Sequence, residues 1–184
     1  MQPEDLSKAL ELYRPSLRLL AGVRLDPRLR EKVDPSDLVQ ESLVKAYANL
    51  SQFQGNTPEQ LYGWVRRILA NEMALAIRRY IGGPRHLERS LEAGLEESSL
   101  HLERWLADLS REPMALVTQR EQIARLVAAL TSLAEDQRTT LELRYLQGMS
   151  PPEIAELQGK TTAAVAGLLR RGLEKLREVL IEES

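Results

Sequence analysis

The chain has 184 residues, of which 43% are hydrophobic and 28% charged, so it can form a packed core and is not disordered throughout. It holds only 1 Phe, 5 Tyr and 2 Trp, a composition typical of helices packed on helices and unlike a β-sandwich. The absence of cysteine excludes disulfides, thiolate nucleophiles and cysteine-ligated metal centres. No apolar run approaches the roughly 18 residues of a membrane-spanning helix, and the first residues are acidic, so we expect a cytoplasmic protein with no signal peptide and no membrane contact.

The charges are unevenly distributed, although 25 basic and 27 acidic residues nearly cancel. Residues 84–115 carry 4 basic and 7 acidic side chains, whereas Lys160–Arg177 carry five basic and one acidic. A local basic patch favours an anionic partner such as nucleic acid. Basic residues near a helix C-terminus also complement the helix dipole, which is the ordinary alternative.

A helix-breaking sequence, Gly82-Gly83-Pro84, divides the chain. The acidic, serine-rich stretch that follows predicts a linker, in which apolar spacing indicates a helix around Leu100–Leu109 with Trp105 docked on a neighbouring element. We therefore expect an all-α protein with two small helical domains joined by an acidic linker: 1–83, linker 84–115, and 116–184.

Three helices are predicted before the linker. An apolar stripe from Leu6 to Leu20 predicts the first, with Pro15 kinking or breaking it and Gly22 ending it. Asp34, followed by Pro35, can cap a second helix that reaches about Leu50. Thr57-Pro58-Glu59-Gln60 is a capping box for a third helix that reaches about Ile81.

Two of these helices carry polar faces. On the second, steps of 100° per residue gather Asp37, Gln40, Glu41 and Val44 opposite a core face of Val39, Leu43, Ala46 and Leu50. On the third, Arg67, Asn71 and Arg78 form a stripe that can follow a phosphate backbone, while Trp64 lies with the core residues. A solvated surface is the ordinary alternative for both faces.

The second block predicts a helix-turn-helix. Helices are indicated around Ile123–Leu130 and from Glu135 to about Leu146. Ser150-Pro151-Pro152-Glu153 then caps a short helix that stops at Gly159, and Thr161 caps a longer basic helix with a buried stripe from Val165 to Leu180. The second helix of such a pair enters the DNA major groove. A four-helix bundle that binds no nucleic acid is the alternative.

Three stretches resemble bacterial sigma factors of the extracytoplasmic-function (ECF) group. Residues 34–55 resemble the family's polymerase-clamp-binding helix, with Asp37, Gln40 and Glu41 matching its D-x-x-Q-E pattern. Residues 64–79 resemble the helix that recognises the minus-ten element and melts the promoter, and residues 133–180 resemble the domain that binds the minus-thirty-five element. The three stretches occur in the family's order.

The resemblance implies a sigma factor that binds core RNA polymerase and promoter DNA, requires no cofactor and is not an enzyme. It allows an anti-sigma protein as a further partner. Polymerase binding is assigned to Asp37, Gln40 and Glu41. Together with the helical spacing, the resemblance assigns minus-ten binding to Phe53, Gln54, Asn56, Arg67, Asn71 and Arg78. Within the stretch that resembles the minus-thirty-five-binding domain, the residues that helical spacing places away from the core are assigned to DNA binding: Lys160, Thr161, Thr162, Ala164, Gly167, Arg170 and Arg171.

Some positions depart from the family's pattern. Leu75 stands where an acid is common, and Ala166 and Leu168 stand where the recognition helix usually has basic residues, which predicts a different upstream DNA preference. An acidic linker can also cover basic DNA-binding helices, which leaves self-inhibition open.

Two other classes of function compete with this interpretation. A stand-alone helix-turn-helix regulator would bind duplex DNA without polymerase, and it would have no need of the face around Glu41. A helical enzyme or scaffold would use the acidic face for a metal, but His86 and His101 both lie in the linker and no Gly-rich phosphate loop is present.

Overall fold

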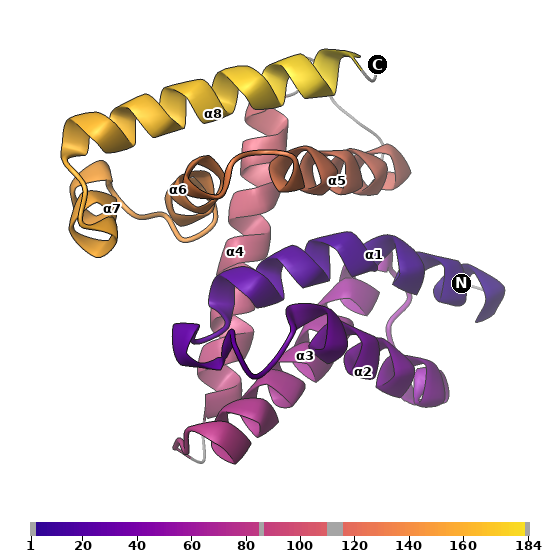
Figure 1. The fold of residues 1–184 in the computed structure, drawn as a ribbon. Helices are drawn as coiled ribbons and strands as arrows, with labels where there is room; N and C mark the ends of the chain where they lie inside the picture. Colours follow the sequence, from indigo (N-terminus) through magenta and orange to yellow (C-terminus); the bar gives the residue numbers. More distant parts are fainter. Residues whose placement is uncertain (1–2, 85–86, 110–115, 183–184) are drawn as a thin grey trace. The chain divides into compact units, whose positions relative to one another are not determined.

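The computed structural model describes residues 3–84, 87–109 and 116–182, and all regular elements in these ranges are helical. The predicted all-α fold is therefore confirmed. The chain divides into two compact units, Met1–Glu97 and Ser98–Ser184, with the boundary inside helix α4 (Leu87–Leu109; Figure 1).

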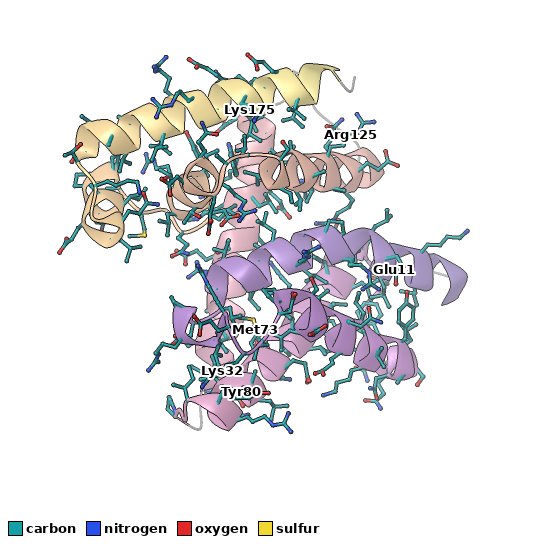
Figure 2. The ribbon with its side chains drawn as sticks, viewed as in Figure 1. Glu11, Lys32, Met73, Tyr80, Arg125 and Lys175 are labelled. Carbon is teal, nitrogen blue, oxygen red and sulfur yellow. The ribbon has the colours of Figure 1, made fainter. Side chains whose placement is uncertain are left out.

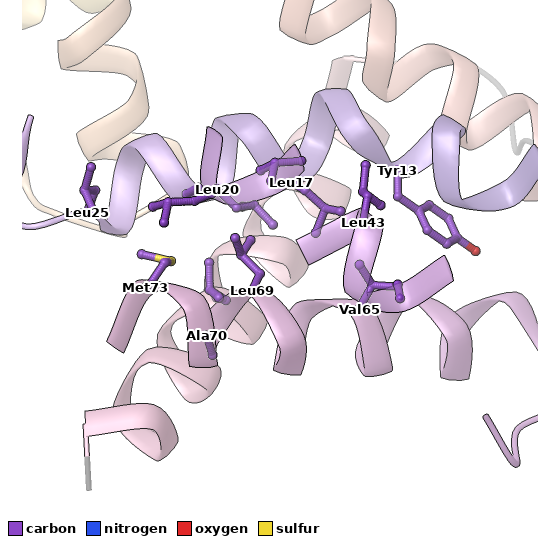
Figure 3. Packing of buried hydrophobic residues seen from close by; sticks show 14 of the residues in the cluster. Tyr13, Leu17, Leu20, Leu25, Leu43, Val65, Leu69, Ala70 and Met73 are labelled. Atoms are coloured by element: carbon purple, nitrogen blue, oxygen red, sulfur yellow. The ribbon is translucent and has the colours of Figure 1, made fainter. Parts of the chain in front are cut away.

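The first unit is built on three helices that pack around one core. These are α1 (Pro3–Arg24), α2 (Pro35–Ala48) and α3 (Pro58–Tyr80), with short 3-10 turns at Pro27–Leu29 and Leu50–Gln52. Figure 3 shows Leu17 and Leu20 of α1, Leu43 of α2, and Val65, Leu69 and Met73 of α3 meeting in this core, where each is almost completely buried. Their burial fixes which faces of α2 and α3 remain exposed.

Helix α1 is longer than the sequence predicted, because it continues through Pro15 and past Gly22 to Arg24. Proline removes one backbone donor from a helix, so neighbouring contacts must hold the chain in place. The Tyr13 hydroxyl donates to the Pro58 carbonyl at 2.9 Å, and the Tyr62 hydroxyl donates to Ser16 Oγ at 3.0 Å. These bonds tie α1 to α3 on both sides of Pro15.

The predicted helix caps in this unit are confirmed. Asp34 Oδ1 accepts a hydrogen bond from the Ser36 N–H at 2.7 Å, and this backbone bond lowers the pKa of the Asp34 carboxyl. Thr57 and Gln60 form the expected reciprocal capping box at the start of α3. The two caps set where the polar faces of α2 and α3 begin.

Helix α4 differs from the expected linker. The sequence predicted a helix only around Leu100–Leu109, whereas the helix begins at Leu87. Leu95 is fully buried in the core of the first unit, and Trp105 is 3% exposed in the second. Each half of α4 thus has its own apolar contacts, which stabilise a helix where the acidic composition suggested a tether. Residues 85–86 and 110–115 of the expected linker, including His86, lie outside the described residues.

The second unit contains the predicted helix-turn-helix. After α5 (Leu116–Thr131) and α6 (Glu135–Tyr145) come the short α7 (Pro151–Gln158) and the long α8 (Thr162–Glu182; Figure 1). Gly159 ends α7 in the left-handed conformation, with φ of 62°, as the sequence indicated for the turn. Ile154, Val165 and Leu143 pack together beneath this turn, so the angle between α7 and α8 is fixed by a small core.

Candidate functional site

The outward face of α2 carries the predicted polar cluster. Asp37, Gln40 and Glu41 are all exposed, and Val44 beside them is 56% exposed. Arg14 of α1 donates to Gln40 Oε1 at 2.6 Å and is itself paired with Glu11 at 2.9 Å. The hydrogen bond from Arg14 lowers the pKa of the Glu11 carboxyl. The face is therefore partly ordered before any partner binds.

A groove of about 440 Å³ continues this face between α2 and α3. Asp37 and Glu41 line one wall, and the apolar side chains of Leu75 and Tyr80, exposed by 50% and 43%, line the other. Lys32 and Tyr80 lie near each other at this end of the unit (Figure 2). This apolar wall was not predicted from the sequence, in which Leu75 stood out only as replacing an acid that is common in the family. A polar edge beside exposed apolar side chains is typical of protein–protein contacts.

An ion pair between a buried carboxylate and a half-exposed lysine joins the two helices that form the groove. Glu72 of α3 is only 6% exposed, and its carboxylate meets Lys45 Nζ of α2 at 2.6 Å. This pair links the two helices that carry the groove's walls. A buried carboxylate without its partner would be costly, so the pair helps to hold α2 against α3.

The second candidate region is a hollow of about 670 Å³ beside the start of α3. Phe53 and Trp64 meet there with ring centroids 5.4 Å apart. Trp64, expected in the core, packs against the core and also lines the hollow. A Cβ on Gly55 would come within 2.9 Å of Gln60 Cβ, so this loop position requires glycine. Aromatic rings at the edge of an open hollow can stack on an unpaired base.

The predicted polar stripe of α3 borders this hollow. Arg67 and Asn71 are exposed and Arg78 is half-buried. The structure adds partners that the sequence did not reveal: Arg67 Nε meets Glu92 at 2.9 Å, and Arg78 Nη1 meets Glu88 at 2.5 Å. Gln54 and Asn56 are exposed in the loop, where the Asn56 N–H donates to Gln60 Oε1 at 2.9 Å.

The third candidate region is the exposed face at the start of α8. Thr161 Oγ1 accepts a hydrogen bond from the Ala164 N–H at 3.1 Å and so caps the helix as predicted. The hydroxyl of Ser150 and its N–H both donate to Glu153, and the hydroxyl bond is the larger cause of the lowered pKa of the Glu153 carboxyl. These caps fix the two helices of the motif. Of the residues predicted to bind DNA here, Gly167 and Lys160 are half-buried and the others are exposed: Thr161, Thr162, Ala164, Arg170 and Arg171.

Two of the predicted basic groups here already have acidic partners. Lys160 Nζ lies 3.3 Å from Asp136, and Arg170 Nη1 lies 3.3 Å from Glu174. Arg171 instead extends along the helix over Gly167, where a Cβ would lie 3.1 Å from its Nη1. Arg171 is therefore the best placed of the three for an anionic ligand.

Two further kinds of site concern residues 3–84, 87–109 and 116–182, the part of the chain that the structure describes. No helix in these ranges is long and apolar enough to cross a membrane. Among the same residues, no three His, Asp or Glu side chains are grouped to hold a metal ion. The acidic face of α2 thus lacks the convergent ligands of a metal site.

Comparison with known proteins gives the decisive observation. Residues 123–176 match the family model "Sigma-70, region 4". Over 145 residues the chain is 30% identical to the ECF RNA polymerase sigma-E factor of Salmonella typhimurium, and the match covers 78% of this chain and 72% of that protein. This chain belongs to the ECF sigma factors.

Two other sigma factors align over nearly the whole chain. The RNA polymerase sigma factor CnrH of Cupriavidus metallidurans is 27% identical over 201 residues, covering 100% of this chain and 99% of CnrH. The ECF RNA polymerase sigma factor SigG of Mycobacterium tuberculosis is 33% identical over 191 residues, covering 95% of this chain. The chain spans about half the length of SigG, with 48% covered.

Proposed function

We propose that this chain binds core RNA polymerase and directs it to specific promoters, where it helps to open the duplex. The observation that carries the proposal is the combination, in one chain, of the exposed α2 face with a helix-turn-helix that matches sigma-70 region 4. A regulator that acts on duplex DNA alone requires only the second feature. The role is regulatory rather than catalytic, and we place the protein in the cytoplasm, where bacterial polymerase acts.

The first unit is proposed to bind polymerase through Asp37, Gln40 and Glu41. The adjacent apolar wall, Leu75 and Tyr80, would be buried in the same contact. An anti-sigma protein that competed with polymerase would have to cover this groove. The charged edge would guide association and the apolar wall would supply burial.

The same unit is proposed to hold the melted minus-ten strand. Phe53 and Trp64 would stack on a base in the hollow, while Gln54 and Asn56 contact its edge or backbone. Arg67, Asn71 and Arg78 would follow the phosphates. In the second unit, the exposed start of α8, from Lys160 to Arg171, would enter the major groove of the minus-thirty-five element.

Copurification with core polymerase tests the central claim. Glu41→Lys should weaken association strongly, because it places a positive charge where the proposed polymerase contact receives a carboxylate. The helicity of the protein should stay unchanged. Glu121→Lys, at an exposed position on α5, is the matched control and should copurify as the wild type does. Equal recovery of polymerase by a folded Glu41→Lys protein would refute the assigned face. Duplex binding without any polymerase association would favour the stand-alone regulator.

A further inference from the structure

The first half of α4 carries two adjacent rows of side chains. Leu87, Leu91 and Leu95 recur every four residues and pack against the core of the first unit. Glu88, Glu92 and Glu96 recur with the same spacing, one residue later, and so form a row about 100° around the helix from the leucines. Docking of the leucine row therefore determines what the glutamate row faces.

The glutamate row faces the arginines of α3. Glu88 meets Arg78 at 2.5 Å, Glu92 meets Arg67 at 2.9 Å, and Glu96 lies 4.0 Å from Arg66. Along α3 the partners occur in the reverse order, so the two helices run antiparallel where they meet. Glu97 adds a fourth pair, with Arg24 of α1 at 2.9 Å.

Two of these carboxylates also enter the hollow described above. Glu92 and Glu96 line it together with Phe53, Trp64 and Arg67. A carboxylate at a guanidinium occupies the place that a phosphate oxygen would take, because both are anionic acceptors for the same donors. The row thus repeats, at helical spacing, the charge pattern of a nucleic-acid backbone.

We propose that the Glu88–Glu92–Glu96 row is an internal occupant of the minus-ten surface, which single-stranded promoter DNA must displace. This inference rests on the proposed function, since it assumes that Arg67 and Arg78 receive DNA. The leucine row holds the helix in place, so displacement requires only that the glutamate side chains turn away. The Arg67–Glu92 pair, whose side chains are 64% and 36% exposed, is of the individually weak surface type, which favours a reversible exchange there.

The consequence is a sigma factor with low affinity for free single strands. Each arginine must lose a carboxylate before it gains a phosphate, so the net gain per contact is small. Removing the carboxylates should therefore tighten the binding of single-stranded DNA. It should also steepen the salt dependence of that binding, because the DNA phosphates would then displace dissolved anions from the arginines instead of fixed carboxylates.

Fluorescence anisotropy of the full chain with a labelled single strand tests this exchange. The triple variant Glu88→Gln, Glu92→Gln, Glu96→Gln should bind about tenfold more tightly, as expected from three weak pairs acting together. A control with the same change of charge, Glu31→Gln, Glu59→Gln, Glu121→Gln, alters exposed glutamates outside α4. It should gain about twofold at most through long-range charge alone. Equal gains in the two variants would overturn the proposal.

A second variant separates position from charge. Glu88→Asp, Glu92→Asp, Glu96→Asp keeps all three charges but retracts each carboxylate by one methylene. It should bind more tightly than the wild type although the net charge is unchanged. Binding identical to wild type by both this variant and the glutamine variant, with helicity retained, would also overturn the proposal.

The arginines distinguish failure of this inference from failure of the proposed function. Arg67→Gln with Arg78→Gln should weaken binding and should also abolish the gain from the three Glu→Gln changes. If the arginine variant binds as wild type does, the assigned minus-ten surface is wrong. If it binds weakly while the glutamine variant shows no gain, the surface stands and only the internal occupant is refuted.

Discussion

The indole ring of Trp105 stacks on the phenol ring of Tyr145, with centroids 4.7 Å apart and ring planes 10° apart. Trp105 belongs to the second half of α4, and Tyr145 is the last residue of α6, just before the turn that leads to the helix-turn-helix. Nearby, Ser98 Oγ donates to the Leu146 carbonyl at 2.8 Å. The second half of α4 is therefore a structural part of the DNA-binding unit.

Trp105→Ala should destabilise the second unit by about 3–5 kcal/mol, because it removes a large buried side chain and leaves a cavity. Urea denaturation followed by circular dichroism measures the loss. Trp105→Phe keeps an aromatic ring on Tyr145 and should recover most of the stability. Leu100→Ala, at a position 47% exposed on the same helix, should change stability little. A Trp105→Ala protein as stable as Leu100→Ala would contradict a docked helix.

The docking of α4 could not be predicted from the sequence, whereas the helix caps could. Helix caps depend on residues two or three apart, so Asp34, Thr57 and Ser150 could be assigned from the sequence. The partners of α4 lie far along the chain, as with Arg24 and Glu97, 73 residues apart. Neither composition nor periodicity encodes such a pairing. An acidic segment that suggested a solvated linker is therefore a helix docked through leucines and glutamates.

The candidate site divides in the same way. Exposure of Asp37, Gln40 and Glu41 followed from the position of the core face opposite them, so helical spacing predicted it. The apolar wall of Leu75 and Tyr80 was not predicted, because Leu75 was noted only as a departure from the family's pattern and a groove between α2 and α3 depends on how the two helices pack. The pairing of Lys160 with Asp136 and of Arg170 with Glu174 likewise required coordinates.

The charge of the Asp34 cap predicts a pH dependence for the first unit. The Ser36 backbone hydrogen bond lowers the folded-state pKa of Asp34 below its unfolded value. The stability that the ionised Asp34 carboxylate gives the first unit is therefore fully present above the unfolded pKa of about 3.9. It is lost as the pH falls through the lower folded-state pKa. At neutral pH, Asp34→Ala should cost about 1 kcal/mol, and the difference from wild type should shrink below about pH 4.

Tryptophan fluorescence can measure this effect in one unit. In a Trp105→Phe background, Trp64 is the sole indole and reports on the first unit. Asp34→Asn keeps an oxygen acceptor at the cap without a titrating charge, so its stability relative to Asp34→Ala should be independent of pH. A constant difference between wild type and Asp34→Ala down to pH 2 would refute the role of the charge.

Replacing two glycines of α8 by alanine should change the stability of the second unit in opposite directions. A Cβ at Gly172 would lie 2.9 Å from Leu141 Cδ1 and 3.3 Å from Leu141 Cγ, and Leu141 is fully buried in α6. Gly172→Ala should therefore destabilise the second unit by about 1–3 kcal/mol through overpacking. At Gly167 the nearest atom is the end of the flexible Arg171 side chain, so Gly167→Ala should stabilise the helix by up to about 1 kcal/mol.

A Trp64→Phe background, in which Trp105 reports on the second unit, allows both stabilities to be measured. The Gly167→Ala variant also tests whether this face of α8 contacts DNA. If the backbone at Gly167 lies close to the groove floor, Gly167→Ala should weaken duplex binding while raising stability. Equal duplex affinity of Gly167→Ala and wild type would show that this turn of α8 stands away from the groove.

The last prediction concerns Arg171. Its guanidinium extends over Gly167 toward the exposed start of α8, whereas the neighbouring Arg170 is paired with Glu174. Because the Arg171 guanidinium lies along the side of α8 and not at the N-terminal end of the helix, a phosphate contact is favoured over a contact with a base edge. Arg171→Ala should then weaken binding almost equally on matched and scrambled upstream elements and should lower the magnitude of the salt slope by about 0.9.

Titrations at several salt concentrations distinguish this contact from base readout. If Arg171 reads a guanine, the loss should be about 1–3 kcal/mol, confined to the matched element and sensitive to one base position. Arg177→Ala removes an exposed arginine further along α8 and controls for net charge. An Arg171→Ala protein whose affinity and slope match those of Arg177→Ala would place Arg171 away from the DNA, because two arginines with the same charge then contribute only through the overall field.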